Sequence, residues 1–326
     1  MTDARGSILV SGSLAFDNIM NFPGYFKDHV LPDKVHIINI SFLVQELKRQ
    51  RGGCAANIAY TLALLGERPR IVAAAGRDFP EYAEWLSQQG VDVQGIRIFQ
   101  EDVTASCFIT TDAADNQITG FYPGAMNRAG EISLRQEAGP NPRFCIIAPD
   151  APAAMVRHCQ ECREGKIPFL FDPSFQVTAM DGPTLYQAAR GARAVLLNDY
   201  EFAVFLEKTG KTQDQLLEDV ELIVVTYGEQ GSEIFRRGSE SVKIPPAKCR
   251  EVVDPTGAGD AYRGGFLAGL VRGHDLDVCG RMGSVAAVFA VEHYGTQNHR
   301  YTPETFFARY EENFGPAPVV TAPGHA

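Results

Sequence analysis

Short apolar runs alternate with amphipathic stretches along most of the chain. Runs with the length and composition of buried strands lie at 7–14, 70–75, 144–147, 169–171, 194–197 and 222–225. Apolar residues recur with helical spacing at 58–65, 80–89 and 153–164. Strands that alternate with helices build parallel sheets that are covered on both faces. The pattern therefore predicts an α/β fold with a doubly wound, mostly parallel sheet flanked by helices.

Two regions, at about 20–44 and 104–123, depart from this alternation. The first holds short extended pieces, such as 35–40, between Pro-Gly and Pro-Asp turns, and the second alternates around a turn at 114–116. We interpret both as parts of a small β lid over the sheet, although ordinary surface hairpins would have the same pattern. The predicted organisation is one α/β domain at 1–314 that carries this lid. A segment rich in Pro, Gly and Ala at 315–326 is predicted to be a disordered C-terminal tail.

Composition and charge narrow the range of partners. The chain has 326 residues, a formal net charge of −10 and seven Cys. The negative charge argues against a nucleic-acid partner, which requires a basic surface. The odd number of Cys without framework spacing, together with the lack of a secretory leader, predicts reduced thiols and a cytoplasmic location. No apolar run reaches membrane-spanning length, so we expect no membrane partner.

The segment 254–260, Asp-Pro-Thr-Gly-Ala-Gly-Asp, runs directly into a helical pattern and has the chemistry of an anion site. Gly257, Ala258 and Gly259 are expected at the helix N-terminus, where unpaired N–H groups and the helix dipole favour a phosphate. The carboxylate of Asp260 would face the same crevice and accept the proton of an attacking hydroxyl. This arrangement indicates phosphoryl transfer. Ordinary helix capping, with Asp260 as a favourable N-terminal charge, is the alternative.

Two segments far apart in the chain carry a family resemblance. Residues 254–267 resemble the C-terminal signature of the ribokinase-like (PfkB) family of carbohydrate and nucleoside kinases, and Gly-Gly-Cys-Ala-Ala-Asn at 52–57 resembles the N-terminal signature. Within this family the similarity is greatest to the bacterial adenosine kinases, through segments at 12–17, 41–44, 74–79, 121–126 and 226–231. The resemblance implies ATP-dependent phosphorylation of the 5′-hydroxyl of adenosine to give AMP. Asp260 would be the general base, and Gly257, Ala258 and Gly259 would form the anion hole.

The same resemblance implies which residues hold the nucleoside. Asp17, just after the first predicted strand, would accept hydrogen bonds from the ribose hydroxyls. Gly52 and Gly53 would let the ligand lie against bare backbone, and Asn57 would both donate to and accept from a hydroxyl. Without the resemblance, a lone Asp after a strand is typical of a helix cap.

Further contacts to the nucleoside are expected from small and aromatic residues. Ser13 and Ser41 are candidate substrate contacts by resemblance. Phe121 and Phe108, both in the lid region, are candidates to stack on a purine, although each aromatic has core packing as its alternative. Phe175 or Gln176, in a loop after the strand at 169–171, would reach the base or belong to a packed loop.

Two short motifs imply the nucleotide side of the site. Asn198 and Glu201 match the family element N-x-x-E, in which the Glu organises Mg²⁺ through water. Thr226, Gly228 and Gly231 match T-x-G-x-x-G, which lies beside the triphosphate in the family. Taken without the resemblance, the first motif is a helix N-terminus and the second a glycine-rich turn. The implied cofactors are ATP and Mg²⁺, and a K⁺ ion is implied near Asp254, Thr256 and 295–296.

Two departures from the family pattern leave the acceptor open. Pro255 stands where many relatives carry Thr, and Phe175 stands where close relatives have polar residues. A broader nucleoside kinase for inosine, guanosine or cytidine and a sugar kinase of the ribokinase or fructokinase type are therefore alternatives. A catalytically silent nucleoside-binding protein is an alternative of another class. Unpaired strands at the lid edges predict a homodimer formed through the lid.

Overall fold

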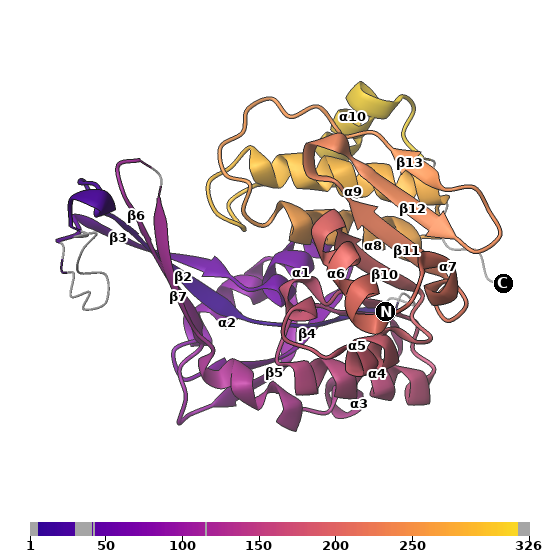
Figure 1. The fold of residues 1–326 in the computed structure, drawn as a ribbon, viewed down its shortest axis with the longest axis horizontal. Helices are drawn as coiled ribbons and strands as arrows, with labels where there is room; N and C mark the ends of the chain where they lie inside the picture. The colour runs from indigo at the N-terminus through magenta and orange to yellow at the C-terminus, as the bar shows by residue number, and fades with distance from the viewer. Residues whose placement is uncertain (1–5, 30–40, 42, 115, 319–326) are drawn as a thin grey trace.

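The computed structural model describes residues 6–29, 41, 43–114 and 116–318 and contains two sheets (Figure 1). The larger sheet has nine strands in the order β13-β12-β11-β10-β9-β8-β1-β4-β5. All pairs from β5 to β11 are parallel, whereas β12 and β13 are added antiparallel at one edge. The bounds are β1 (Ser7–Ser11), β4 (Pro69–Gly76), β5 (Asp92–Phe99), β8 (Pro142–Ile147), β9 (Phe169–Phe171), β10 (Ala194–Asn198), β11 (Leu222–Thr226), β12 (Ser232–Arg236) and β13 (Val242–Ile244). The predicted doubly wound, mostly parallel α/β fold is confirmed.

Helices cover both faces of this sheet and create two cores. One core includes side chains of α1 (Cys54–Leu64), α2 (Pro80–Gln88), α8 (Ala258–Val271), α9 (Leu276–Val291) and α10 (Pro303–Phe314). The other includes side chains of η3 (Gly124–Glu131), α3 (Leu134–Glu137), α4 (Pro152–Gly165), η4 (Ser174–Val177), α5 (Gly182–Ala189), α6 (Asp199–Thr209) and α7 (Gln213–Leu216). Two shorter 3-10 turns are η1 (Phe26–Asp28) and η5 (Gly228–Gln230).

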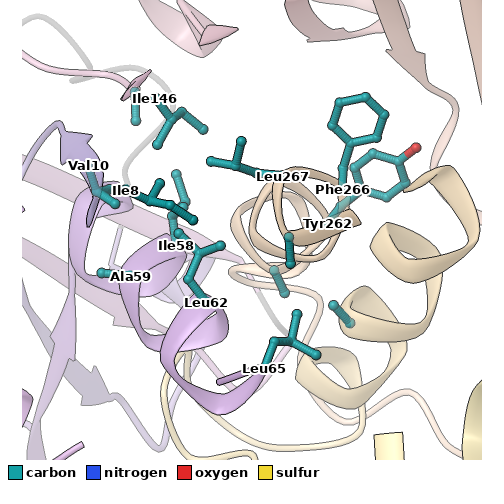
Figure 2. Packing of buried hydrophobic residues seen from close by; sticks show 14 of the residues in the cluster. Ile8, Val10, Ile58, Ala59, Leu62, Leu65, Ile146, Tyr262, Phe266 and Leu267 are labelled. Carbon is teal, nitrogen blue, oxygen red and sulfur yellow. The ribbon is translucent and has the colours of Figure 1, made fainter. Parts of the chain in front are cut away.

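Helix α8 is held from several sides. Figure 2 shows Leu267 and Phe266 of α8 in the same cluster as Ile58 of α1 and Ile8 of β1. Burial of each such side chain contributes about 1.5–3 kcal/mol. At Gly264 a Cβ would lie 2.6 Å from the Thr61 side chain, so α1 approaches α8 more closely than any larger residue would allow. The start of α8 is therefore fixed by the core.

The smaller sheet has four strands in the order β3-β2-β6-β7 and projects from the main body (Figure 1). Its strands are β2 (Ala15–Asn21), β3 (Glu46–Gly52), β6 (Ala105–Thr111) and β7 (Gln117–Tyr122). This sheet confirms the predicted small β lid. Its first pair extends beyond the expected 20–44 on both sides, because β3 reads Glu-Leu-Lys-Arg-Gln-Arg-Gly and is too polar and exposed to show an apolar alternation. The strand expected at 35–40 lies outside the described residues.

The described chain ends shortly after α10. Of the tail predicted at 315–326, residues 315–318 are described and the remaining eight lie outside the described part. Among the described helices, none combines the length and the apolar composition that crossing a bilayer requires.

Candidate active site

The N-terminus of α8 opens onto a cavity. Gly257 precedes the helix with φ +81°, and a Cβ there would lie 2.9 Å from the Thr296 side chain, so only glycine fits without strain. The first-turn N–H groups of a helix lack partners within that helix and attract anions. Ala258 and Gly259 line a cavity of about 530 Å³. As expected, residues 257–259 lie at the start of a helix, next to open space.

Asp260 lies in the first turn of α8 and is bound to α1. The side-chain amide of Asn57 donates from Nδ2 to Oδ2 of Asp260 over 2.8 Å. Burial raises the pKa of Asp260, whereas the charge of Arg263 and hydrogen bonds from Asn57 and the Cys54 thiol lower it. The two family signatures, 203 residues apart at these positions, meet in this contact.

A chain of buried hydrogen bonds continues behind Asn57. Its Oδ1 accepts from Nε2 of Gln297 (2.7 Å), and the same Nε2 donates to the hydroxyl of Tyr82 (2.5 Å). The Tyr82 hydroxyl donates to the carbonyl of Gly52 (3.0 Å). Because an ionised Asp260 only accepts, Asn57 must turn its NH₂ toward it and its oxygen toward Gln297. Sequence reasoning missed Gln297 and Tyr82, since neither belongs to a motif.

A second feature missed from the sequence is a buried ion pair near Asp260. Arg263 of α8 donates from Nη2 to Oδ1 of Asp172 (2.7 Å), and its Nε contacts the other carboxylate oxygen. Asp172 follows β9 and is fully buried, and Arg263 is only 6% exposed. Burial lowers the pKa of Arg263, but the charge of Asp172 and the hydrogen bonds to it outweigh this effect and raise the pKa above its ordinary value, so the guanidinium stays charged.

Asp17 enters the site from the lid strand β2. At Gly52 a Cβ would lie 2.5 Å from the Asp17 carboxylate, so the missing side chain leaves room for it. Burial, followed by the charges of Asp254 and Asp260, raises the pKa of Asp17 to about 6. The Asp17 carboxyl group therefore lies close enough to Asp260 to feel its charge.

The lid register separates the two candidate stacking residues. Asp17 pairs with Cys107 of β6, which pairs with Phe121 of β7, and directly paired residues share one face of a sheet. Phe121 thus lies on the face of Asp17 and is half exposed. Phe108 is one residue further along β6 and lies on the opposite face. Because successive strand residues point to opposite sides, the two candidates cannot both stack on one base, and stacking by either of them stays a prediction.

The loop after β1 packs against the start of α1. The Ser13 hydroxyl accepts from the Cys54 N–H (3.3 Å), and Gly53 has φ +94°, with the space for a Cβ filled by the backbone of residues 13–15. These contacts gather several of the predicted site residues beside the start of α8: Ser13, Asp17, Gly52, Gly53, Asn57 and Asp260. Ser41 is exposed, and the structure describes neither of its neighbours in the chain.

The two motifs predicted for the nucleotide side lie in different surroundings. Thr226, Gly228 and Gly231 line the same cavity as the start of α8. Asn198 and Glu201 form a capping box at α6, in which Asn198 Oδ1 accepts from the Glu201 N–H (2.7 Å) and Glu201 Oε2 accepts from the Asn198 N–H (2.9 Å). The capping alternative thus describes their local geometry.

Three further residues named from the sequence are Phe175, Gln176 and Asp254. Gln176 is buried, and its amide donates to the Asp150 carbonyl (2.7 Å), whereas Phe175 is 53% exposed. Asp254 accepts from the N–H groups of Thr256 and Gly295, each over 2.9 Å. In the described part of the chain, no group of three or more His, Cys, Asp or Glu side chains is arranged to hold a metal ion.

The sequence and the fold of this chain resemble those of known proteins. The model of the pfkB family of carbohydrate kinases matches residues 29–303. A nucleoside kinase of Methanothermobacter thermautotrophicus is 33% identical over 96% of this chain and 98% of its own length.

Solved structures agree in fold. The nucleoside kinase of Burkholderia thailandensis in complex with inosine superposes with a TM-score of 0.85 at 36% identity, covering 96% of this chain and 99% of that one. The nucleoside kinase of Methanocaldococcus jannaschii, described as an archaeal member of the ribokinase family, has a TM-score of 0.85 at 29% identity, covering 95% and 99%. The resemblance found in the signatures at 52–57 and 254–267 is confirmed, and the chain belongs to the pfkB family of carbohydrate kinases.

Proposed function

We propose that this protein is a nucleoside kinase that transfers the γ-phosphoryl group of ATP to the 5′-hydroxyl of adenosine, with AMP and ADP as products. The observation that carries the proposal is the contact between Asn57 and Asp260 at the N-terminus of α8, beside the cavity. It brings a half-buried acceptor for a proton and a helix start suited to phosphate into one place.

The residues on the acceptor side divide the work of binding and reaction. Asp17 accepts from the ribose hydroxyls and Asn57 orients the sugar, while Gly52 leaves room for the Asp17 carboxylate and Gly53 for the backbone of residues 13–15. The 5′-oxygen attacks the γ-phosphorus as the bond from that phosphorus to the β,γ-bridging oxygen breaks. The hydroxyl proton passes to Asp260, and N–H groups at 257–259 stabilise the charge on the phosphoryl oxygens.

The nucleotide takes the cavity beside α8. Thr226, Gly228 and Gly231 line it, so their backbone is available to the ATP phosphates. When bound, Mg²⁺ neutralises part of the phosphate charge. Glu201 fits as a partner through water, because both of its oxygens already accept hydrogen bonds, from Asn198 N–H and Ser174 Oγ. A K⁺ ion near Asp254 is the further cofactor of the proposal.

A broader nucleoside acceptance is the second candidate, and the inosine complex of the Burkholderia thailandensis relative favours it. Adenosine and inosine share the ribose that Asp17 and Asn57 face, and they differ only at the base. Half-exposed Phe121 would stack on either purine, since stacking tolerates both.

The test is ATP consumption by the purified protein against adenosine, inosine, guanosine, cytidine, ribose and fructose, with Mg²⁺ or K⁺ omitted in parallel assays. Asp260→Asn is measured beside the wild type and is expected to lose roughly 10³-fold or more in kcat while still binding adenosine. A clear preference for adenosine supports the proposal, and equal use of inosine supports the second candidate. Preference for ribose or fructose rejects a nucleoside acceptor, and absence of turnover with every acceptor rejects the kinase assignment.

A further inference from the structure

Arg263 has one nitrogen that its ion pair does not use. Its Nε and Nη2 both contact Asp172, but among the described residues Nη1 has no hydrogen-bond partner. Side chains on a helix lean toward its N-terminus, so the guanidinium of Arg263 reaches back one turn. A Cβ at Gly259 would lie 2.9 Å from Nη1, which places this nitrogen against the anion-site glycine.

The surroundings of Arg263 are strongly acidic. The charges of Asp172, Asp260 and Glu201 all act on its guanidinium, and the polyphosphate of ATP would add further negative charge. If the ion pair served only to link α8 to the end of β9, the two nitrogens that bind Asp172 would be sufficient. The bidentate pair fixes the plane of the guanidinium and thereby the direction of the third nitrogen.

We propose that Arg263 is a further catalytic residue, whose Nη1 donates to an oxygen of the phosphoryl group while that group passes from ATP to the acceptor hydroxyl. The inference rests on the proposed function. Arg263 keeps its proton throughout, because the acceptor proton goes to Asp260, and Asp172 is the positioning residue that aims the guanidinium. An arginine supplied to the transferred phosphoryl group stabilises the charge of the transition state in other phosphotransferases.

The chain offers a matched control in Arg309. This residue of α10 is also buried, at 4% exposed, and its Nη2 contacts the Glu292 carboxylate and the Lys248 carbonyl. It does not line the cavity at α8. Arg309→Met therefore breaks a buried arginine–carboxylate contact at a residue that does not itself line the cavity.

The experiment compares Arg263→Met, Arg263→Lys and Arg309→Met for kcat, KM, thermal unfolding and formation of a complex with MgADP, aluminium fluoride and the best acceptor. We expect Arg263→Met to lower kcat roughly 10²–10³-fold, with KM for the acceptor changed less than threefold and the aluminium fluoride complex lost. Arg263→Lys should recover little, since an ammonium group cannot hold Asp172 with two nitrogens and extend a third. Arg309→Met should unfold at lower temperature but retain kcat within twofold.

A double variant covers the outcome in which Arg263→Met fails to fold. Arg263→Met with Asp172→Leu removes both charges and leaves no buried unpaired carboxylate. If either folded variant keeps kcat within twofold of the wild type, the catalytic assignment is overturned and the pair is only structural. If the wild type itself turns over no acceptor, the proposed function fails instead, so the two failures are distinguishable.

Discussion

The α8 side of the candidate site and the lid side are built differently. On the α8 side, Asn57 is buried and Asp260 half-buried, and both belong to one directed series of hydrogen bonds that leads to Gln297. On the lid side, Asp17 and Phe121 project from a thin four-stranded sheet, and Phe121 is half exposed. The core thus holds Asp260 and Asn57 in place, whereas Asp17 and Phe121 would become fully buried only when a nucleoside binds. Changes on the α8 side should lower kcat, and changes on the lid side should raise KM.

Apart from the changes at Asp260 and Arg263, the largest effect is expected from Gln297, which touches no reacting group. Gln297→Leu removes the donor that holds the Asn57 oxygen, so the amide loses its fixed orientation toward Asp260. A misplacement of about 1 Å can cost roughly 10²-fold in rate. We expect kcat to fall roughly 10- to 100-fold with little change in KM for the nucleoside. Steady-state kinetics on both substrates measures this split.

The isosteric variant Gln297→Glu tests the direction of the hydrogen bonds. A carboxylate at 297 only accepts, so Asn57 would turn its NH₂ toward it and its oxygen toward Asp260. Asp260 would lose a hydrogen-bond donor that lowers its pKa, so its pKa would rise. As the pH is lowered, the variant should therefore lose activity at a higher pH than the wild type does. An unchanged acid limb of the kcat profile would contradict the orienting role of Gln297.

On the lid side, nucleoside binding should depend on the ionisation of Asp17. Its pKa is raised to about 6, so the acceptor carboxylate is present above pH 6 and is lost as pH falls through that value. The affinity for nucleoside should then fall by up to about tenfold per pH unit. Isothermal titration calorimetry without ATP measures binding separately from the reaction at Asp260. Asp17→Asn should bind weakly at every pH, and a pH dependence that persists in this variant would assign the titration to another group.

The core strands and helices were predictable because their apolar residues form short runs or recur with helical spacing. The strand at 169–171 and the helix from Pro80 match their expected positions closely, since both bury apolar side chains against the sheet. Strands β12 and β13 and the polar strand β3 were not identified. β3 is mostly exposed at the edge of its sheet, and β12 and β13 are short strands that mix polar and apolar residues, so none of the three has an apolar run.

The candidate site was predictable only where its residues stand in local motifs. Asp260 and Asn57 were selected in this way, and the structure puts them in contact. Gln297 lies 240 residues from Asn57, and Arg263 lies 91 residues from Asp172. Such contacts arise from packing of distant elements, which no local pattern records. For the same reason, the face on which a lid residue lies became known only with the strand register.

That register offers the sharpest comparison within the lid, because Phe121 and Phe108 are almost equally exposed, at 50% and 47%, on opposite faces. Stacking of an aromatic ring on a base contributes about 1–3 kcal/mol. Phe121→Ala should therefore raise KM for the nucleoside about tenfold at nearly constant kcat. Phe108→Ala removes the same side chain from the same sheet and should change KM less than twofold. If both variants raise KM equally, the lid acts on binding through its stability and not through a ring placed over the base.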